Sequence, residues 1–360
     1  MKIALVHYAA SPVIGGVERV MEEHARLFFG AGHDVTIFCQ RGGSASEGIR
    51  VAALFGNPAQ ALAGFDVVFI HNVLTMPFDM ALTSGLRDFA SASGRTRVIA
   101  WTHDVAAANP DLTPVPALLS QPAPSVEWVA VSELRRRQLR ELLGVRDCRV
   151  IPNGVDPARV LALPDNVRAF VEERQLLDGR LVFLHPTRLL RRKNVELGIE
   201  IVKALGDAVL VITGAEDPHN PASAAYSARL RDAADDCVIF AADHFPVRDE
   251  ELSALYRLAD LLMFPSRHEG FGLPLLEARL NRLPAVYANI EPLDEIAGVC
   301  GFPISPNESA PEIAGRLKPW IAANPHIRDR RDVIGRFSWR AIYRRHLVPL
   351  LDGEPDSSDK

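Results

Sequence analysis

The chain has 360 residues, of which 48% are hydrophobic and 24% charged, and its formal net charge is −5. This length suits two domains, each with its own core, and the composition is that of a soluble globular protein. Neither half is basic, with net charges of −1 up to residue 156 and −4 beyond it, and aromatic residues are few. Both features argue against nucleic acid or an anionic membrane as the partner.

The cysteines and the terminal segments indicate a cytoplasmic protein. Cys39, Cys148, Cys237 and Cys300 lie far apart in the sequence, so we predict separate thiols in a reducing compartment. The sequence contains neither a signal peptide nor an apolar run long enough for a transmembrane helix. The arginine-rich segment 135–140 is read first as a solvated helix face, with contact to an anion or a membrane as the alternative.

Short apolar runs alternate with amphipathic stretches along the whole chain, which predicts βαβ units and parallel sheets of the α/β class. In the first half we expect strands at Ile3–Val6, Val35–Phe38, Val67–Ile70, Val98–Trp101, Trp128–Val131 and Val150–Ile151. In the second half we expect them at Leu181–Leu184, Val209–Ile212, Val238–Phe240, Leu261–Phe264 and Ala285–Tyr287.

The turn at Pro152-Asn153-Gly154 separates two series of strand-helix units. We therefore predict an N-terminal Rossmann-like domain over residues 1–157 and a C-terminal one over 158–335. An amphipathic helix is expected over 336–352, followed by a disordered tail at 353–360. Ligands of such open sheets bind at the carboxyl ends of the strands, so the residues that follow each strand are the candidates for a site.

In the first half, glycines and histidines follow the strands. Gly15 and Gly16 stand just before the first helix, where backbone N–H groups are open to an anion, although a tight turn without a ligand explains them equally well. His103 follows one expected strand, and His7 and His71 follow two others. A single histidine is more often structural, but three at strand ends favour a site.

In the second half, two cations and two carboxylates follow the strands. Arg188 comes just after a strand and Lys193 just before the next helix, an arrangement that suits a diphosphate. Glu269 and Glu277 are separated by seven residues, and the segment between them contains Gly-Phe-Gly-Leu-Pro. A loop and the start of a helix can thereby present two carboxylates to one ligand.

These motifs together resemble the retaining family-four glycosyltransferases, also called group 1 glycosyl transferases, which have the GT-B fold and an E-x7-E motif. The resemblance covers nearly the whole chain. It implies two Rossmann-like doubly wound parallel-sheet domains with a cleft between them, and a C-terminal helix that crosses back to the first domain. The first domain would bind the acceptor and the second the nucleotide-sugar donor.

The resemblance also implies roles for individual residues. Arg188 and Lys193 would hold the donor diphosphate, Glu269 the donor sugar, and Glu277 the ribose. The catalytic group would comprise Arg188, Lys193, Glu269 and His103, the last of which would face the sugar near the reacting carbon. The remaining donor-binding residues would be Gly15, Gly16, Phe271, Gly272, Leu273 and Glu277.

The function expected from this is transfer of a hexosyl group from a nucleotide-sugar, of the GDP-mannose or UDP-glucose type, to a small soluble or glycan acceptor. The sequence contains no D-x-D motif, so we expect neither a metal nor another cofactor. A nucleotide-sugar epimerase or hydrolase on the same fold is the alternative. A Rossmann oxidoreductase is disfavoured because G-x-G-x-x-G is missing. A non-catalytic sugar-nucleotide binder would have no need of the full charged set.

Overall fold

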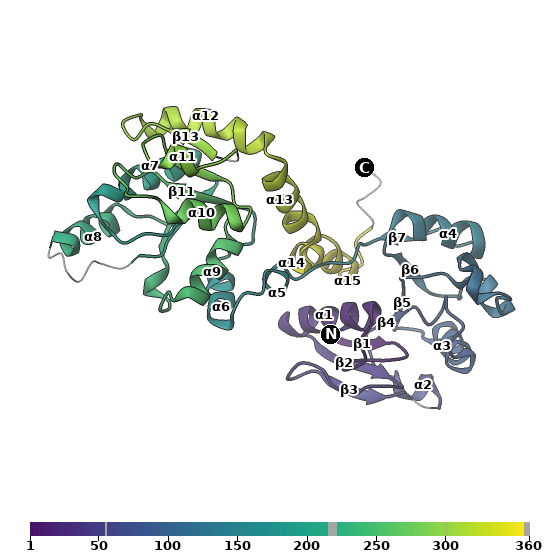
Figure 1. Ribbon diagram of the computed structural model, residues 1–360. Coiled ribbons are helices and arrows are strands. Elements are labelled where there is room, and N and C mark those ends of the chain that lie inside the picture. Colours follow the sequence, from purple (N-terminus) through teal and green to yellow (C-terminus); the bar gives the residue numbers. More distant parts are fainter. Residues whose placement is uncertain (55, 215–221, 300, 356–360) are drawn as a thin grey trace. The chain divides into compact units, whose positions relative to one another are not determined.

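The structure is a computed structural model that describes residues 1–54, 56–214, 222–299 and 301–355. The chain divides into two compact units (Figure 1). Unit 1 comprises residues 1–155 and the segment from Phe337 onward, and unit 2 comprises Asp156–Arg336. Each unit is a parallel sheet with its own helices. Within the described ranges, no helix is long and apolar enough to span a membrane.

Unit 1 contains a seven-stranded sheet in the order β3-β2-β1-β4-β5-β6-β7, with every pair parallel. The strands are β1 Lys2–Val6, β2 Asp34–Cys39, β3 Arg50–Ala53, β4 Val67–His71, β5 Arg97–Thr102, β6 Glu127–Ala130 and β7 Arg149–Val150. The order reverses between β1 and β4, which makes the sheet doubly wound. Strand β4 is buried at all five positions, as its uninterrupted apolar sequence predicts.

The helices of unit 1 come from both ends of the chain. They are α1 Gly16–Gly30, α2 Pro58–Ala61, α3 Met80–Ala92, the 3-10 turns η1 Ala106–Ala108, η2 Pro110–Leu112 and η3 Ala117–Ser120, α4 Glu133–Leu143, α14 Trp339–Ile342, the π-helical turn η6 Tyr343–Leu347 and α15 Val348–Leu351. The last three form the expected C-terminal helix, with a π-helical turn in its middle.

Unit 2 contains a six-stranded parallel sheet in the order β10-β9-β8-β11-β12-β13. Its strands are β8 Leu181–His185, β9 Ala208–Ile212, β10 Val238–Phe240, β11 Leu261–Phe264, β12 Ala285–Ala288 and β13 Gly301–Ile304. Its helices are α5 Pro157–Val160, α6 Asp165–Glu173, η4 Arg191–Lys193, α7 Val195–Leu205, α8 Ala222–Ala233, η5 Ala241–Asp243, α9 Asp249–Leu258, α10 Leu273–Leu280, α11 Leu293–Ile296, α12 Ala310–Ala323 and α13 Pro325–Phe337.

The predicted α/β architecture of two doubly wound parallel sheets is confirmed, and each predicted strand matches an observed one to within a residue or two. Two strands were missed, β3 and β13, and both lie at the edge of a sheet. Their burial patterns are only partial, so their sequences lack the apolar run that marked the central strands. Cys300, one of the four predicted separate thiols, lies outside the described residues.

The C-terminal segment belongs to unit 1 through both packing and hydrogen bonds. Trp339 packs so close to Gly154 that a Cβ at Gly154 would lie 2.6 Å from the indole ring. The guanidinium of Arg97 donates to the carbonyls of Leu350 and Leu351, both at 2.8 Å. Residues 353 and 354, expected to belong to a disordered tail, donate their backbone N–H groups to carbonyls of helix α15. Residues 356–360 lie outside the described part.

Unit 1 buries a histidine in its core without hydrogen bonds. His24, on helix α1, has no exposed surface, and its ring centroid lies 4.6 Å from that of Trp101. Within the described part of the chain, neither of its ring nitrogens has a hydrogen-bond partner. Burial, and secondarily the nearby His103, lower the pKa of His24 to about 3. The folded protein therefore holds this ring neutral, whereas the unfolded chain protonates it below its ordinary pKa.

Because the pKa of His24 differs between the folded and unfolded states, we predict that acid destabilises the protein and that His24→Leu reduces this destabilisation. Between the two pKa values the unfolded state binds more protons, so the free energy of unfolding falls as the pH drops below about 6.5. At pH 5 one such histidine costs about 2 kcal/mol relative to neutral pH. We expect His24→Leu to remove that part of the fall in the free energy of unfolding, measured by urea denaturation at pH 7.5 and at pH 5. His326→Leu, at an exposed position of unit 2, is the control; equal pH dependence in wild type and His24→Leu would contradict the argument.

Candidate active site

The predicted charged residues of unit 2 lie at the carboxyl edge of its sheet, where the strand order reverses. Strands β8 and β11 are neighbours, with Leu261 paired to Phe183 and Leu262 to Leu184. The segment with Arg188 and Lys193 follows β8, and the loop with Glu269 follows β11. Two polar loops thus start from adjacent strands, which is where open α/β sheets bind ligands.

The carboxylate of Glu269 is buried and held by two cations. Lys193 Nζ donates to Oε1 at 2.5 Å, and Arg192 Nη1 donates to Oε2 at 3.3 Å. The Glu269 side chain is 7% exposed, compared with 12% for Lys193 and 46% for Arg192. Lys193 also stands over the ring of Phe264, 5.2 Å from its centroid. The inner cation is thereby fixed from two sides, while the outer one reaches solvent.

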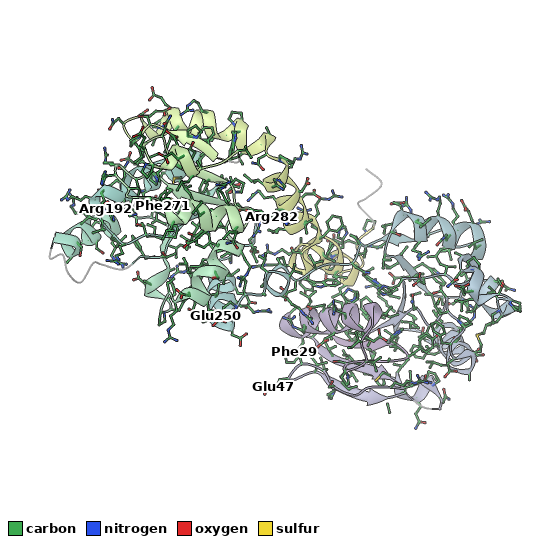
Figure 2. All side chains as sticks on the ribbon, in the orientation of Figure 1. Phe29, Glu47, Arg192, Glu250, Phe271 and Arg282 are labelled. Carbon is green, nitrogen blue, oxygen red and sulfur yellow. The ribbon has the colours of Figure 1, made fainter. Side chains whose placement is uncertain are left out.

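The backbone holds these two loops together. Asn194 takes a left-handed conformation, with φ of 53°, at the start of α7, and its buried amide donates to the carbonyl of Pro265 at 3.1 Å. The N–H of Arg267 donates to the carbonyl of Arg192 at 2.8 Å. Because both bonds link the β8 loop to the β11 loop, the pairing of Lys193 with Glu269 does not depend on side chains alone. Arg192, in the loop after β8, and Phe271, in the loop after β11, are both labelled in Figure 2.

Helix α10 begins directly after a glycine that its packing requires. Gly272 precedes the helix with φ of 101°, and a Cβ there would lie 2.4 Å from Leu293, so only glycine fits without displacement. Pro274 is the second helical residue. The neighbouring side chains of Phe271 and Leu273 are 49% and 61% exposed. The loop thus presents an open backbone and two apolar side chains to solvent.

Glu277, the second carboxylate of the motif, has a partner that the sequence did not indicate. It lies in α10 just beyond the first turn, and its Oε2 accepts a hydrogen bond from the hydroxyl of Tyr256 at 2.6 Å. Tyr256 is on α9 and is only 3% exposed. Its burial, followed by this hydrogen bond to the Glu277 carboxylate, raises the pKa of Tyr256, so the hydroxyl stays a donor. Tyr256 therefore orients Glu277.

Two further polar side chains are buried at the same edge. His185, the last residue of β8, and Ser266, two residues after β11, are fully buried. Among the described residues, neither ring nitrogen of His185 nor the hydroxyl of Ser266 has a hydrogen-bond partner. Burial and the charge of Lys193 lower the pKa of His185 to about 3, so the ring is neutral beside the cation.

In unit 1, the glycine loop meets a carboxylate of its own helix. Gly15 precedes α1 in an extended conformation, and Gly16 is the first helical residue. A Cβ on Gly15 would lie 2.0 Å from the carboxylate of Glu18, which in turn is 3.7 Å from Nε2 of His7. The N-terminus of α1, expected to meet a diphosphate, thus already has an anionic side chain beside it.

His103 lies at the carboxyl edge of unit 1 within a group of histidines. Its Nε2 is 3.4 Å from Nδ1 of His71, whose carbonyl accepts a bond from Nδ1 of His7 at 2.8 Å. The backbone N–H of His103 donates to the side chain of Asn72 at 2.7 Å. Burial, and secondarily His7, lower the pKa of His103 to about 3. A neutral ring of this kind can donate or accept a hydrogen bond without carrying charge.

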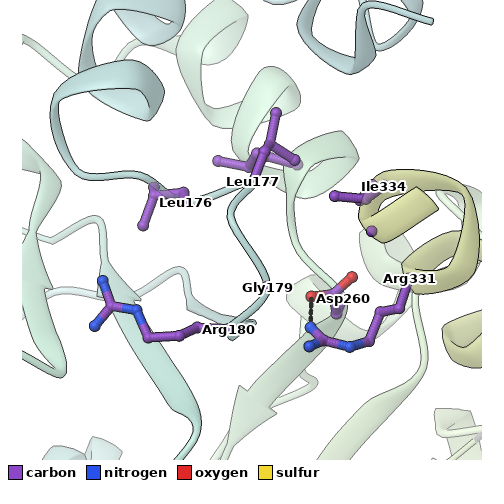
Figure 3. Close-up of a pocket in the computed structure, with 9 residues that line it drawn as sticks. Leu176, Leu177, Gly179, Arg180, Asp260, Arg331 and Ile334 are labelled. Carbon is purple, nitrogen blue, oxygen red and sulfur yellow. Dashed lines mark ion pairs between the residues drawn. The ribbon is translucent and has the colours of Figure 1, made fainter. Parts of the chain in front are cut away.

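Two other features lie apart from these residues. Across the described ranges, no three His, Cys, Asp or Glu side chains come together in a way that could hold a metal ion. A pocket of about 110 Å³ in unit 2 lies beside Gly179, Asp260 and Arg331, before the amino ends of β8 and β11 (Figure 3). There the Asp260 carboxylate pairs with Arg331 at 3.8 Å and accepts from the N–H of Val182 at 2.9 Å. This is a structural anchor for α13 at the opposite edge of the sheet.

Two doubly wound parallel sheets, each with polar side chains at its carboxyl edge, define a two-domain α/β protein of the Rossmann type, and the sequence comparisons identify the family. Residues 14–159 match the model of glycosyltransferase family 4, and residues 167–335 match that of the group 1 glycosyl transferases. The chain belongs to the group 1 glycosyltransferases, which have the GT-B fold. It is a hexosyltransferase, and this assignment excludes the Rossmann oxidoreductase alternative.

Individual relatives and solved structures are similar to different extents. Mannosylglucosylglycerate synthase of Thermotoga maritima is 22% identical, over 81% of each chain. O-antigen chain mannosyltransferase B of Escherichia coli is 44% identical over 62 residues, which is 17% of this chain and 16% of that protein. The structure of Anabaena HepE in complex with UDP and glucose has 18% identity and a TM-score of 0.40, covering 98% of this chain and all of the other.

The sequence indicated the charged residues of the candidate site but not those that the structure places against them. Arg192, Asn194 and Tyr256 contact Glu269 or Glu277 or join the loops that carry them. Arg192 lies beside Lys193, but the sequence assigned it no role. Tyr256 is 21 residues before its partner on another helix, and no local pattern signals such a contact.

If Glu277 binds the ribose, as the family resemblance implies, Tyr256→Phe should weaken the donor and leave turnover nearly intact. Loss of a hydrogen bond to a carboxylate costs about 1.5–3 kcal/mol, so we expect roughly a tenfold or larger rise in donor Kd and KM with kcat little changed. Tyr226→Phe is the matched control, because its hydroxyl bonds Glu196 at 2.5 Å in the same unit. An equal effect of both variants, or a fall confined to kcat, would refute the positioning role.

Proposed function

We propose that this hexosyltransferase takes its sugar from a nucleotide-sugar and transfers it, with retention of configuration, to a hydroxyl of a small or glycan acceptor. Unit 2 binds the donor and unit 1 the acceptor. The observation that carries the proposal is the buried Glu269 carboxylate held by Lys193 and Arg192 at the carboxyl edge of unit 2. A sugar hydroxyl suits such a carboxylate, and a diphosphate suits the cations that neutralise it.

A mannosyl group is the first candidate for the sugar. Several relatives carry the name of mannosyltransferases, including one that is 44% identical over a short segment. We therefore propose GDP-mannose as the donor, with UDP-glucose as the second possibility. Thermal shift with each nucleotide-sugar at the same concentration separates them, because the ligand that binds more tightly raises the melting temperature more.

The proposed chemistry uses the charged residues of unit 2 on the leaving group. The bond between the anomeric carbon and the diphosphate oxygen breaks, and the acceptor oxygen bonds to the same carbon on the same face. The acceptor proton passes to an oxygen of the departing diphosphate. Arg188 and Lys193 stabilise the negative charge that grows there. Both oxygens of Glu269 accept from cations, which suits binding of the sugar rather than attack on it.

In unit 1, His103 would hydrogen-bond the sugar near the reacting carbon. Because its pKa is low, the ring would act as a neutral partner over the physiological range. A diphosphate that reached Gly15 and Gly16 would have to displace the carboxylate of Glu18. We propose that the reaction needs neither a metal nor another cofactor and takes place in the cytoplasm without strong attachment to a membrane.

Replacing Lys193 or Arg188 by Ala should lower kcat on the order of 10²-fold or more, because these cations act on charge that develops in the transition state. Affinity for guanosine or uridine, which lack the diphosphate, should change little. Lys203→Ala is the control, since this lysine of α7 donates to the Ala233 carbonyl instead. Equal losses in nucleoside affinity and rate would contradict the assignment.

Activity should survive treatment with EDTA. The reason is that two cations, Arg188 and Lys193, follow β8 at the proposed diphosphate site and can supply the charge that a divalent ion would otherwise provide. The measurement is hexosyl transfer before and after chelation, in metal-free buffer. Complete loss with EDTA, restored by Mg²⁺ or Mn²⁺, would show that the reaction requires a metal.

A further inference from the structure

One aromatic side chain at the carboxyl edge of unit 1 is left open to solvent. Phe78, in the loop between β4 and α3, is 64% exposed, a larger fraction than Phe29 at 43% or Phe271 at 49%. Its ring packs edge-on against Tyr8, with centroids 5.6 Å apart and planes at 71°. One face of the Tyr8–Phe78 pair is thus supported by protein, while the Phe78 ring remains largely in water.

The loop that carries Phe78 is held in place by hydrogen bonds. The Tyr8 hydroxyl donates to the carbonyl of Met76 at 3.0 Å, and burial raises the pKa of Tyr8 to about 12, so the hydroxyl stays protonated. Thr75 Oγ1 donates to the carbonyl of Asp104 at 2.7 Å. These bonds join the loop to the ends of β1 and β5. An exposed ring on a fixed loop is a preorganised contact surface and pays little ordering entropy on binding.

The same pair is connected to the proposed catalytic histidine. The rings of His7 and Tyr8 are 5.2 Å apart. His7 donates to the carbonyl of His71, and the His71 ring is 5.7 Å from that of His103. A continuous series of contacts therefore runs from His103 to the exposed Phe78. Phe78 and the group proposed to face the reacting carbon therefore lie at the same carboxyl edge of unit 1.

Polar groups beside Phe78 indicate what that molecule is. The Asp79 carboxylate accepts from Gln40 Nε2 at 2.7 Å and from the N–H of Leu82 at 2.9 Å. The bond from Gln40, followed by that from Leu82, lowers the pKa of Asp79, so it is ionised at neutral pH. An ionised carboxylate beside one aromatic ring suits a ligand with a C–H face and hydroxyl edges. An alkyl chain would desolvate the carboxylate without replacing its hydrogen bonds.

We infer that the Tyr8–Phe78 pair is a subsite for a pyranose ring of the acceptor, and this inference rests on the proposed function. The C–H groups on one face of the sugar pack on the negative face of the Phe78 ring, and its hydroxyls donate to Asp79. The acceptor is accordingly a saccharide or glycoside whose sugar ring, not an apolar aglycone, is recognised here.

Saturation-transfer NMR with n-octyl β-D-glucopyranoside below its micellar concentration tests this directly, because the probe carries both chemistries. Irradiation of the protein's aromatic protons should saturate the C–H protons of the sugar ring more than those of the octyl chain. Phe78→Ala should reduce the ring signal about fivefold or more, as expected for loss of a central aromatic contact. Phe78→Trp should retain it, and Phe29→Ala, the matched exposed aromatic of unit 1, should leave it unchanged.

Two results would overturn the subsite: preferential saturation of the octyl chain, or a ring signal that Phe78→Ala does not reduce. GDP and UDP binding to Phe78→Ala, followed by thermal shift, should equal that of wild type, which separates this surface from the donor residues. Ring saturation that depends on Phe78 but without any hexosyl transfer would sink the proposed function and leave the sugar subsite. Hexosyl transfer whose acceptor KM is the same in Phe78→Ala and in wild type would rule out the subsite and leave the proposed function intact.

Discussion

The geometry of the donor-side residues depends on one buried ion pair, that of Glu269 with Lys193. A carboxylate that is almost entirely removed from water is costly unless it is neutralised and hydrogen-bonded. Lys193 and Arg192 meet that requirement. In the proposed function, a diphosphate would compete for these cations and free the carboxylate for sugar hydroxyls. Stability of the protein and affinity for the donor would then be linked through the same atoms.

The backbone around this pair is arranged so that neither loop can shift alone. Asn194 adopts a left-handed conformation and bonds Pro265 in the other loop, and Gly272 allows close packing that a side chain would prevent. On the far side, Tyr256 fixes Glu277 from a separate helix. Each charged side chain therefore has a rigid neighbour that sets its direction. Such preorganisation is what electrostatic stabilisation of a transition state requires.

Unit 1 presents neutral histidines and an exposed aromatic ring at its carboxyl edge. The pKa values of His7, His24, His71 and His103 are all lowered, chiefly by burial. Phe78 offers a hydrophobic ring, and the Asp79 carboxylate follows it in the chain. In the proposed function this surface would bind an acceptor sugar, whereas the cations of unit 2 would bind a diphosphate.

The sequence by itself determined the architecture of two parallel sheets, because buried central strands need uninterrupted apolar runs, and each run can be recognised in the sequence without knowledge of the others. It also indicated Arg188, Lys193, Glu269, Glu277 and His103 as candidates, since residues that follow parallel strands gather at one edge. The half-buried edge strands β3 and β13 left no such pattern. Only the tertiary structure decided that Arg192 reaches Glu269, that Tyr256 bonds Glu277 and that Phe78 stands exposed on Tyr8. These contacts join residues on different elements, and their partners are set by packing, which no local spacing in the chain encodes.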